Sequence, residues 1–246
     1  MHGYGTPEQE RLIAQAEHWR RPLICDGTHL EPGTRLLEVG CGVGAVLAVL
    51  GLEYPGVELT GVDIEPRQLE FARGHLERSG VDATLIEGDA TALPFADDSF
   101  EHVWTMWLLE HLADPVAALR EARRALVPGG RITAIEVDYG TCFASPSTPA
   151  LEELFTAVVD AMAAAGWSDA GTRLPAWLAE AGFQEIDEGE RPFEFRDAEL
   201  ASQSANAADV VESALGPSPG VDELRALPTV PGARLGWVMH KSTAVR

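Results

Sequence analysis

The 246-residue sequence predicts an α/β fold in which helices cover a doubly wound, mostly parallel sheet. From Thr34 onward, short runs rich in apolar and β-branched residues alternate with longer segments of helical periodicity. This pattern is typical of parallel strands joined by crossover helices. Glycines follow the first of these runs, as expected where a chain turns tightly from a strand into a helix. Together these observations predict a single sheet flanked by helices.

The elements of the first part of the chain follow from this alternation. Strands are expected at Arg35–Val39, Glu58–Asp63, Ala83–Glu87, Phe100–Thr105 and Arg131–Val137. Helices are expected at Ala45–Leu52, from Pro66 to just before Gly80, and at Pro115–Leu126. Proline suits the first turn of a helix, where its missing N–H would have no partner, and glycine suits the residue after the last turn. The glycines in Pro128-Gly129-Gly130 should end the third helix.

The chain changes character after Asp138. Residues 145–149 are rich in Ser, Pro and Thr, and helices are expected to follow at Leu151–Ala165 and Leu174–Ala181. An insertion this late in a sheet usually lies over its open edge as a lid. A sixth strand is expected at Phe183–Phe195, a helix at Ala198–Leu215 and a final strand at Leu235–Val245.

The composition excludes several classes of partner. Eighteen Lys+Arg against 39 Asp+Glu give a net charge of −21, whereas nucleic acids and anionic membranes are held mainly by basic side chains. Cys25, Cys41 and Cys142 lie far apart and fit neither a zinc ribbon nor a disulfide framework. The N-terminus lacks the apolar region of a signal peptide, and the apolar stretch near Val43–Leu52 is too short to span a bilayer. We therefore expect a cytoplasmic protein without nucleic-acid or membrane partners.

The first motif is Glu38-Val39-Gly40-Cys41-Gly42-Val43-Gly44, which ends a strand and opens a helix. Glycines at this place let a ligand approach bare backbone N–H groups. With Ala45, the segment also fits the G-x-G-x-x-G/A pattern of dinucleotide-binding proteins. Asp63 ends the next strand, 19 residues after Gly44, where a carboxylate can bind two ribose hydroxyls or cap the following helix. Both motifs suit a cofactor that contains adenosine.

Four blocks occur in order between about Thr34 and Val137: LLEVGCGVG, GVDIEP, EGDATALPFADDSF and RRALVPGGRITAIE. With them the chain resembles the class I S-adenosylmethionine-dependent methyltransferases, particularly the small-molecule branch typified by ubiquinone/menaquinone biosynthesis methyltransferases. The resemblance implies a Rossmann-like sheet of seven strands, the last antiparallel, with a helical lid. It also implies that S-adenosylmethionine is the cofactor, that S-adenosylhomocysteine is the product, and that the acceptor is a small molecule of secondary or specialised metabolism.

The resemblance further implies a role for each part of the chain. We expect an N-terminal helical cap at 1–33, a cofactor-binding core at 34–138, a helical lid or acceptor region at 139–182, and C-terminal elements completing the sheet at 183–246. The implied contacts are Glu38, Gly40, Gly42 and Gly44 for the methionine part, Asp63 for the ribose, Ile64, Gln68, Asp89 and Ala90 for the adenine, Met106, Trp107 and His111 for closure of the site, and Tyr4 folding over the cofactor.

Some of these residues also have a structural interpretation. Asp89 either accepts a hydrogen bond from the adenine amino group or caps the backbone of the residues that follow it. Cys41 is expected to be a packing residue, because no histidine is adjacent to activate it. Trp107 forms either core or pocket wall. His111 is either a catalytic base or a packing residue at a helix start.

Three polar residues near the fifth expected strand are further candidates. Glu136 and Asp138 lie on one face of this strand at its carboxyl end, where open α/β sheets bind ligands. Tyr139 follows directly. The alternative for both acids is a solvated position at the strand end.

Methyl transfer from a sulfonium is an in-line displacement, so positioning supplies most of the catalysis and no metal is required. A base matters only if the acceptor atom carries a proton. A nicotinamide-dependent oxidoreductase is the alternative, supported by Gly40–Ala45 and Asp63, but the chain has no Tyr-x-x-x-Lys pair, since its only lysine is Lys241. Nucleic-acid methylation is disfavoured because Thr105-Met106-Trp107-Leu108 differs from the Asn/Asp-Pro-Pro-Tyr/Phe block of amino-methylating DNA enzymes. The acceptor and the oligomeric state stay open, with a homodimer as one option.

Overall fold

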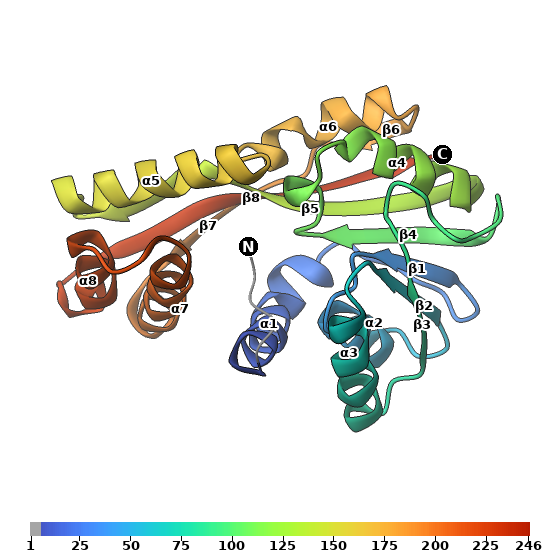
Figure 1. The fold of residues 1–246 in the computed structure, drawn as a ribbon, viewed down its shortest axis with the longest axis horizontal. Helices are drawn as coiled ribbons and strands as arrows, with labels where there is room; N and C mark the ends of the chain where they lie inside the picture. The colour runs from blue at the N-terminus through green and yellow to red at the C-terminus, as the bar shows by residue number, and fades with distance from the viewer. Residues whose placement is uncertain (1–5) are drawn as a thin grey trace.

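The computed structural model describes residues 6–246 and contains one eight-stranded sheet of order β3-β2-β1-β4-β5-β8-β6, in which β7 also pairs with β8 (Figure 1). The parallel strands are β1 (Arg35–Val39), β2 (Glu58–Asp63), β3 (Ala83–Glu87), β4 (Phe100–Met106) and β5 (Leu126–Ser145). Strand β8 (Arg234–Val245) runs antiparallel to β5. The predicted α/β class, with a mostly parallel sheet and an antiparallel last strand, is confirmed.

The segment expected as one strand over 183–195 forms two. These are β6 (Gln184–Asp187) and β7 (Glu190–Phe195), both antiparallel to β8. Gly189 separates them at φ +50°, where a Cβ would collide with the carbonyl oxygen of Lys241. The backbone N–H of Lys241 donates to the Gly189 carbonyl at 3.0 Å. This close backbone approach explains why the sheet has eight strands rather than the expected seven.

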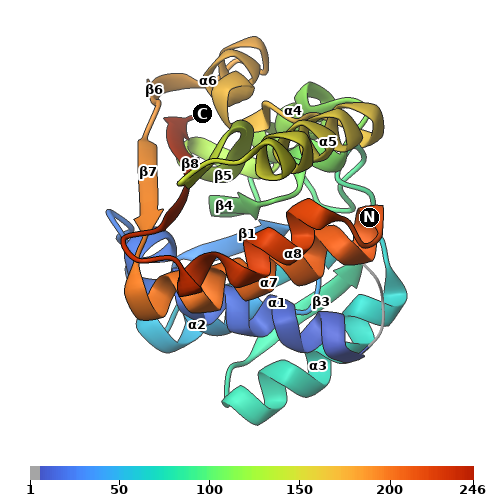
Figure 2. The same ribbon diagram turned by 90° about the vertical axis from the view of Figure 1, so that its left-hand side faces the viewer.

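Helices lie on both sides of the sheet (Figure 2). One side carries α1 (Thr6–Trp19), α2 (Ala45–Glu53), α3 (Pro66–Ser79), α7 (Asp197–Leu215) and α8 (Pro219–Ala226), and the other carries α4 (Pro115–Ala125), α5 (Pro149–Ala165) and α6 (Ala170–Glu180). The core consists of two separate apolar clusters. Leu47 of α2 packs in one, which also includes Leu154 of α5 where this helix meets α8, and Leu119 of α4 packs with Leu174 of α6 in the other.

The long strands β5 and β8 carry the C-terminal helices. Strand β5 extends beyond the expected Arg131–Val137 at both ends. It begins at Leu126, which pairs with Phe100 of β4, and it continues to Ser145 because its pairing with β8 resumes after an irregularity between Asp138 and Phe143. Helix α5 packs against β5 and α8, and α7 packs against α8. Helix α8 was not expected, although Ser218 caps it and Pro219 opens it. In the described part of the chain, no helix is long and apolar enough to cross a membrane.

The N-terminal segment is attached to the sheet through Lys241 of β8, which is 4% exposed. Its ammonium group lies 5.4 Å from the ring centroid of Trp104. It donates to the carbonyl oxygens of Leu23 at 2.9 Å, Ile24 at 3.1 Å and Asp26, and to the hydroxyl of Thr28 at 2.8 Å. Most of these oxygens lie at or just after the end of the π-helix η1 (Arg20–Ile24), where a cation is favourable. Burial lowers the pKa of Lys241 to about 8.

We expect Lys241→Met to lower the free energy of unfolding by about 3 kcal/mol, because buried carbonyl oxygens lose their donor. Urea denaturation at pH 7 measures this. The matched control is Arg225→Met, which removes a partly exposed cation paired with Asp209 and Glu212 and should change stability by less than about 1 kcal/mol. Equal losses in the two variants would contradict the structural role of Lys241.

Candidate functional site

The loop between β1 and α2 contains three glycines in the left-handed backbone region. Gly40, Gly42 and Gly44 have φ values of +75°, +48° and +71°. A Cβ on Gly40 would lie 2.8 Å from Leu108, whereas a Cβ on Gly42 would meet nothing within 4 Å. Cys41 is buried in the core beside them, in agreement with its expected packing role. The loop is therefore packed against protein at Gly40 and open at Gly42.

Asp63 fastens this loop to the end of β2. Its Oδ2 accepts the N–H of Gly42 at 2.8 Å, and its Oδ1 accepts the N–H of Glu65 at 2.9 Å. The alternative role of Asp63 as helix cap is wrong, because the side chain that caps α3 is Glu65, which accepts the N–H of Arg67. A carboxylate oxygen has two lone pairs, so Asp63 can still accept further hydrogen bonds.

Two residues expected near the adenine lie beside Asp63. Ile64 is 67% exposed, an unusual position for a large apolar side chain. Gln68 is buried and accepts a hydrogen bond from the side chain of Gln9 in α1 at 3.2 Å. Gln68 thus links α3 to the N-terminal helix, and Ile64 presents an apolar surface at the carboxyl edge of the sheet.

Asp89 lies at the next loop, after β3. Its Oδ1 accepts both the N–H and the hydroxyl of Thr91 at 2.8 Å, and these bonds lower the pKa of Asp89. Asp89 therefore caps the backbone that follows it, as its structural interpretation predicts, through Oδ1 alone. Within residues 6–246, Oδ2 of Asp89 has no hydrogen-bond partner, so it can still accept one. Ala90 is partly buried and packs against the second apolar cluster.

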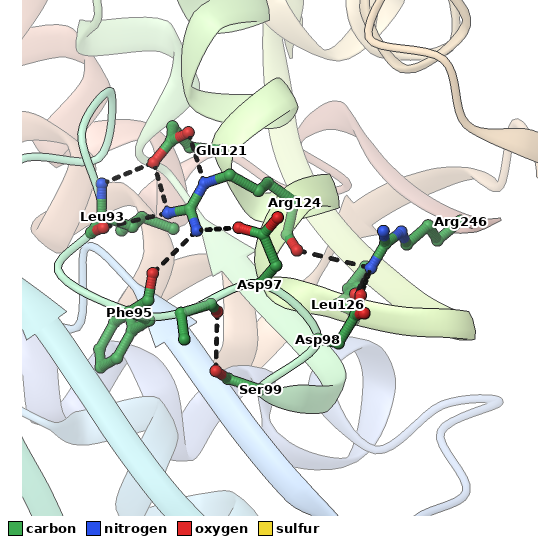
Figure 3. A network of polar contacts seen from close by, with 10 residues as sticks. Leu93, Phe95, Asp97, Asp98, Ser99, Glu121, Arg124, Leu126 and Arg246 are labelled. Atoms are coloured by element: carbon green, nitrogen blue, oxygen red, sulfur yellow. Dashed lines mark hydrogen bonds and ion pairs between the residues drawn. The ribbon is translucent and has the colours of Figure 1, made fainter.

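The chain that follows Asp89 is held by a network of polar contacts around Arg124 of α4 (Figure 3). The guanidinium group of Arg124 binds the carbonyls of Leu93 at 3.1 Å and Phe95 at 2.8 Å, and the carboxylates of Asp97 and Glu121, each at 2.8 Å. Arg246 binds Asp98 and the carbonyl of Leu126 nearby. The loop between β3 and β4 is thereby fixed against α4.

The turn after β4 rests on a buried carboxyl group. Glu136 of β5 is 0% exposed, and its Oε1 accepts the N–H groups of Leu108 at 3.0 Å and Leu109 at 2.8 Å. Its Oε2 is buried without a hydrogen-bond partner among the described residues. Burial and the charge of Glu110 raise the pKa of Glu136 despite the two donors. Its alternative as a solvated acid is wrong, because Glu136 anchors the 3₁₀ turn η2 (Leu109–His111).

Glu110, which the sequence did not single out, lies in this turn and is 1% exposed. Its Oε1 accepts the hydroxyl of Tyr139 at 3.1 Å and lies 3.4 Å from Nε2 of His111. Its Oε2 is also buried without a partner within 6–246. Burial raises the pKa of Glu110 to about 7, although the bond from Tyr139 opposes the shift. A carboxyl group between Leu109 and His111 in an otherwise apolar segment was the available signal.

The other predicted residues of this region are placed as follows. Met106 is buried, and Trp107 is partly buried at φ +52° with its N–H bonded to the carbonyl of Ile135 at 2.9 Å. Asp138 is bonded to Gly140 and Thr172 within the fold. Tyr4 lies outside the described residues.

Glu38 is the last of the predicted contacts. It is buried in β1, and burial together with the charge of Asp63 raises its pKa. Its Oε2 has no hydrogen-bond partner among the described residues. The structure thus places Glu38, the glycine loop, Asp63 and Asp89 at the carboxyl ends of β1, β2 and β3, and the turn that carries Glu110 and His111 at the carboxyl end of β4.

Comparison with known proteins shows what part of the chain is similar to. Residues 37–134 match the family model described as "Methyltransferase domain". The chain is 36% identical over 118 residues to the demethylmenaquinone methyltransferase of Thermus thermophilus, a match covering 48% of this chain and 53% of that protein. The chain spans about half the length of the curated relatives it matches.

Two solved structures show the same fold. The [4+2]-cyclase SpnF superposes with a TM-score of 0.61 at 20% identity, over 95% of this chain and 81% of that one. Phosphoethanolamine N-methyltransferase 2 of Haemonchus contortus, bound to phosphomonomethylethanolamine and S-adenosylhomocysteine, superposes with a TM-score of 0.59 at 18% identity, over 98% and 53%. These matches confirm the predicted resemblance to methyltransferases over this part of the chain and the predicted fold.

The buried acid Glu110 predicts a specific pH dependence of stability. Its folded pKa of about 7 lies above the ordinary value of 4.5, so between these pH values the folded protein keeps a proton that the unfolded chain releases. Wild type therefore loses stability relative to Glu110→Gln as the pH rises through this window. Urea denaturation measures the free energy of unfolding of the variant minus that of wild type. This difference should be larger at pH 8 than at pH 4.5 by on the order of 3 kcal/mol.

The control for this experiment is Glu121→Gln. Arg124 holds the pKa of Glu121 below its ordinary value, so the same substitution should lose stability at pH 8 relative to acid pH. A Glu110→Gln difference that does not change with pH would contradict the burial of a protonated carboxyl group.

Proposed function

We propose that the chain transfers a methyl group from S-adenosylmethionine to a small-molecule acceptor, because residues 37–134 match the family model described as "Methyltransferase domain". The observation that carries the proposal is the pairing of Asp63 with the open glycine loop. The carboxylate and the glycine loop lie together at the carboxyl edge of the sheet, where open α/β folds bind nucleotides.

The residues present fit this cofactor. The space beyond Gly42 leaves room for the methionine part, and the unpartnered Oε2 of Glu38 is a buried acceptor beside the same loop. Asp63 would hold the ribose, and exposed Ile64 would cover one face of the adenine. Asp89 would accept from the adenine amino group through Oδ2. When bound, S-adenosylmethionine supplies an electrophilic methyl group on a positively charged sulfur.

The contribution of the chain to the reaction is mainly positioning. The turn at 107–112 follows β4 directly, and two of its backbone N–H groups donate to the buried carboxyl group of Glu136. We assign to this turn the closure of the site, with His111 as the residue placed to act as a base. The helical region at 139–182 and the N-terminal helix are proposed to form the acceptor pocket, because orientation of the acceptor and exclusion of water supply the rate.

The acceptor class is drawn from the relatives. The Thermus thermophilus protein is named for demethylmenaquinone, a small molecule, and this supports a small-molecule acceptor here. Secondary or specialised metabolism, a cytoplasmic location and a homodimer stay predictions. The nicotinamide-dependent alternative is not favoured, because the family match and the order of the loops point to the methyl donor.

Calorimetry tests the cofactor assignment. Wild type should bind S-adenosylhomocysteine and should give no heat with NAD or NADP. Asp63→Ala should weaken binding by on the order of 2 kcal/mol or more, about 30-fold, because the ligand hydroxyls lose their acceptor. Asp82→Ala is the control, an exposed aspartate just before β3, at the opposite edge of the sheet, and its affinity should equal that of wild type. Tight nicotinamide binding, or equal affinities for all three proteins, would overturn the assignment.

A further inference from the structure

The adjacent residues Glu110 and His111 differ sharply in exposure. The side chain of Glu110 is 2% exposed and that of His111 is 32% exposed, yet Oε1 of the first lies 3.4 Å from Nε2 of the second. A carboxylate at this distance forms an ion pair once the imidazole is protonated. The buried carboxyl group of Glu110 thus lies next to an imidazole, that of His111, which is partly exposed to solvent.

The turn that holds this pair is fixed on several sides. Glu136 accepts two of its backbone N–H groups. Trp167, between α5 and α6, donates its backbone N–H to the Glu110 carbonyl at 2.9 Å and its indole N–H to the Leu112 carbonyl at 3.0 Å. Tyr139 holds the Glu110 side chain itself. These contacts hold the backbone of the turn that carries the imidazole.

Stability does not account for a second buried carboxyl group beside Glu136. Burying an acid without full pairing is unfavourable, and residues that are kept in this state at the edge of a binding site are candidates for function. The titratable groups that face Glu110 from the neighbouring elements are Glu136 and Tyr139 of β5, and both are acids. No described cation other than protonated His111 pairs with Glu110.

We propose that Glu110 is a positioning residue that orients His111 to take a proton from the methyl acceptor, and that the acceptor is therefore a protic nucleophile such as a phenol, an enol or another hydroxyl compound. The inference rests on the proposed function and specifies its substrate class. An acceptor whose reacting atom has a free lone pair and no proton to lose would not need this pair.

His111 takes the proton of the acceptor O–H as the electron pair of that oxygen forms the bond to the methyl carbon. The carbon–sulfur electron pair stays on the sulfur, which leaves as a neutral thioether. The charge that the sulfur loses ends on the imidazolium of His111, beside the carboxylate of Glu110, and the proton passes to solvent through the exposed side of the ring.

The test is an NMR titration of the histidine rings in the full chain bound to S-adenosylhomocysteine. His111 is assigned by its loss in His111→Gln, and exposed His29 is the internal reference. Because the pKa of Glu110 is about 7, its carboxylate is present only in the upper part of the imidazole titration, and the two groups titrate as a pair. Glu110→Gln should therefore move the titration midpoint of His111 to lower pH by up to about one unit, since the opposite charge is removed. In wild type, at a pH where the His111 ring is neutral, its nitrogen chemical shifts should place the ring proton on Nε2. This preference should be lost in Glu110→Gln.

Tyr139→Phe is the matched control, since it removes the other hydrogen bond to the same oxygen and keeps the charge. It should leave both the midpoint and the tautomer of His111 closer to wild type than Glu110→Gln does. If Glu110→Gln does not fold, Glu110→Ala and Glu110→Asp provide the comparison of charge removed with charge kept. An unchanged His111 titration in a folded variant that still binds S-adenosylhomocysteine would overturn the inference alone, whereas absence of binding in wild type would overturn the proposed function.

Discussion

The bond between Asp63 and the glycine loop is the interaction on which the site depends. One carboxylate receives an N–H from the loop after β1 and another from the loop after β2. Because β1 and β2 are parallel neighbours, both loops emerge at the same edge of the sheet. Asp63 fixes their relative position, and it does so with the group that would also hold the ribose. In the proposed function, one side chain therefore both joins the two loops and binds the cofactor.

The other half of the site rests on a different kind of interaction. Glu136 and Glu110 place two carboxyl groups in the interior near the carboxyl ends of β4 and β5, where each raises the free energy of the other's ionised form. The protein compensates with backbone donors from the turn and with the hydroxyl of Tyr139. The glycine-loop side of the candidate site thus relies on open backbone geometry, whereas the turn after β4 relies on buried polar contacts.

Much of the fold could be predicted because local sequence determines it. The strands β1, β2 and β3 occur at their expected bounds, since short apolar runs between glycines and prolines have few alternatives. The division of β6 from β7 could not be predicted, because it depends on the close approach of Gly189 to β8, about fifty residues later in the chain. The extension of β5 likewise depends on pairing with a distant strand.

The same distinction holds for the site. Gly40, Gly42, Gly44 and Asp63 form an ordered motif, and the structure brings them together at one edge. Glu110 was missed because its burial is produced by Tyr139 and Trp167, which follow it by 29 and 57 positions. A carboxylate in a sequence otherwise indicates a solvated surface. Only the tertiary structure shows that this one is inside.

The most direct test of the account is a crystal structure of the protein with S-adenosylhomocysteine. The account predicts the ribose hydroxyls on Asp63, the adenine against Ile64, and the sulfur facing the turn that carries Glu110 and His111. The space opposite the sulfur would then be bordered by that turn. A ligand bound away from Asp63, or a sulfur directed away from the turn after β4, would contradict it.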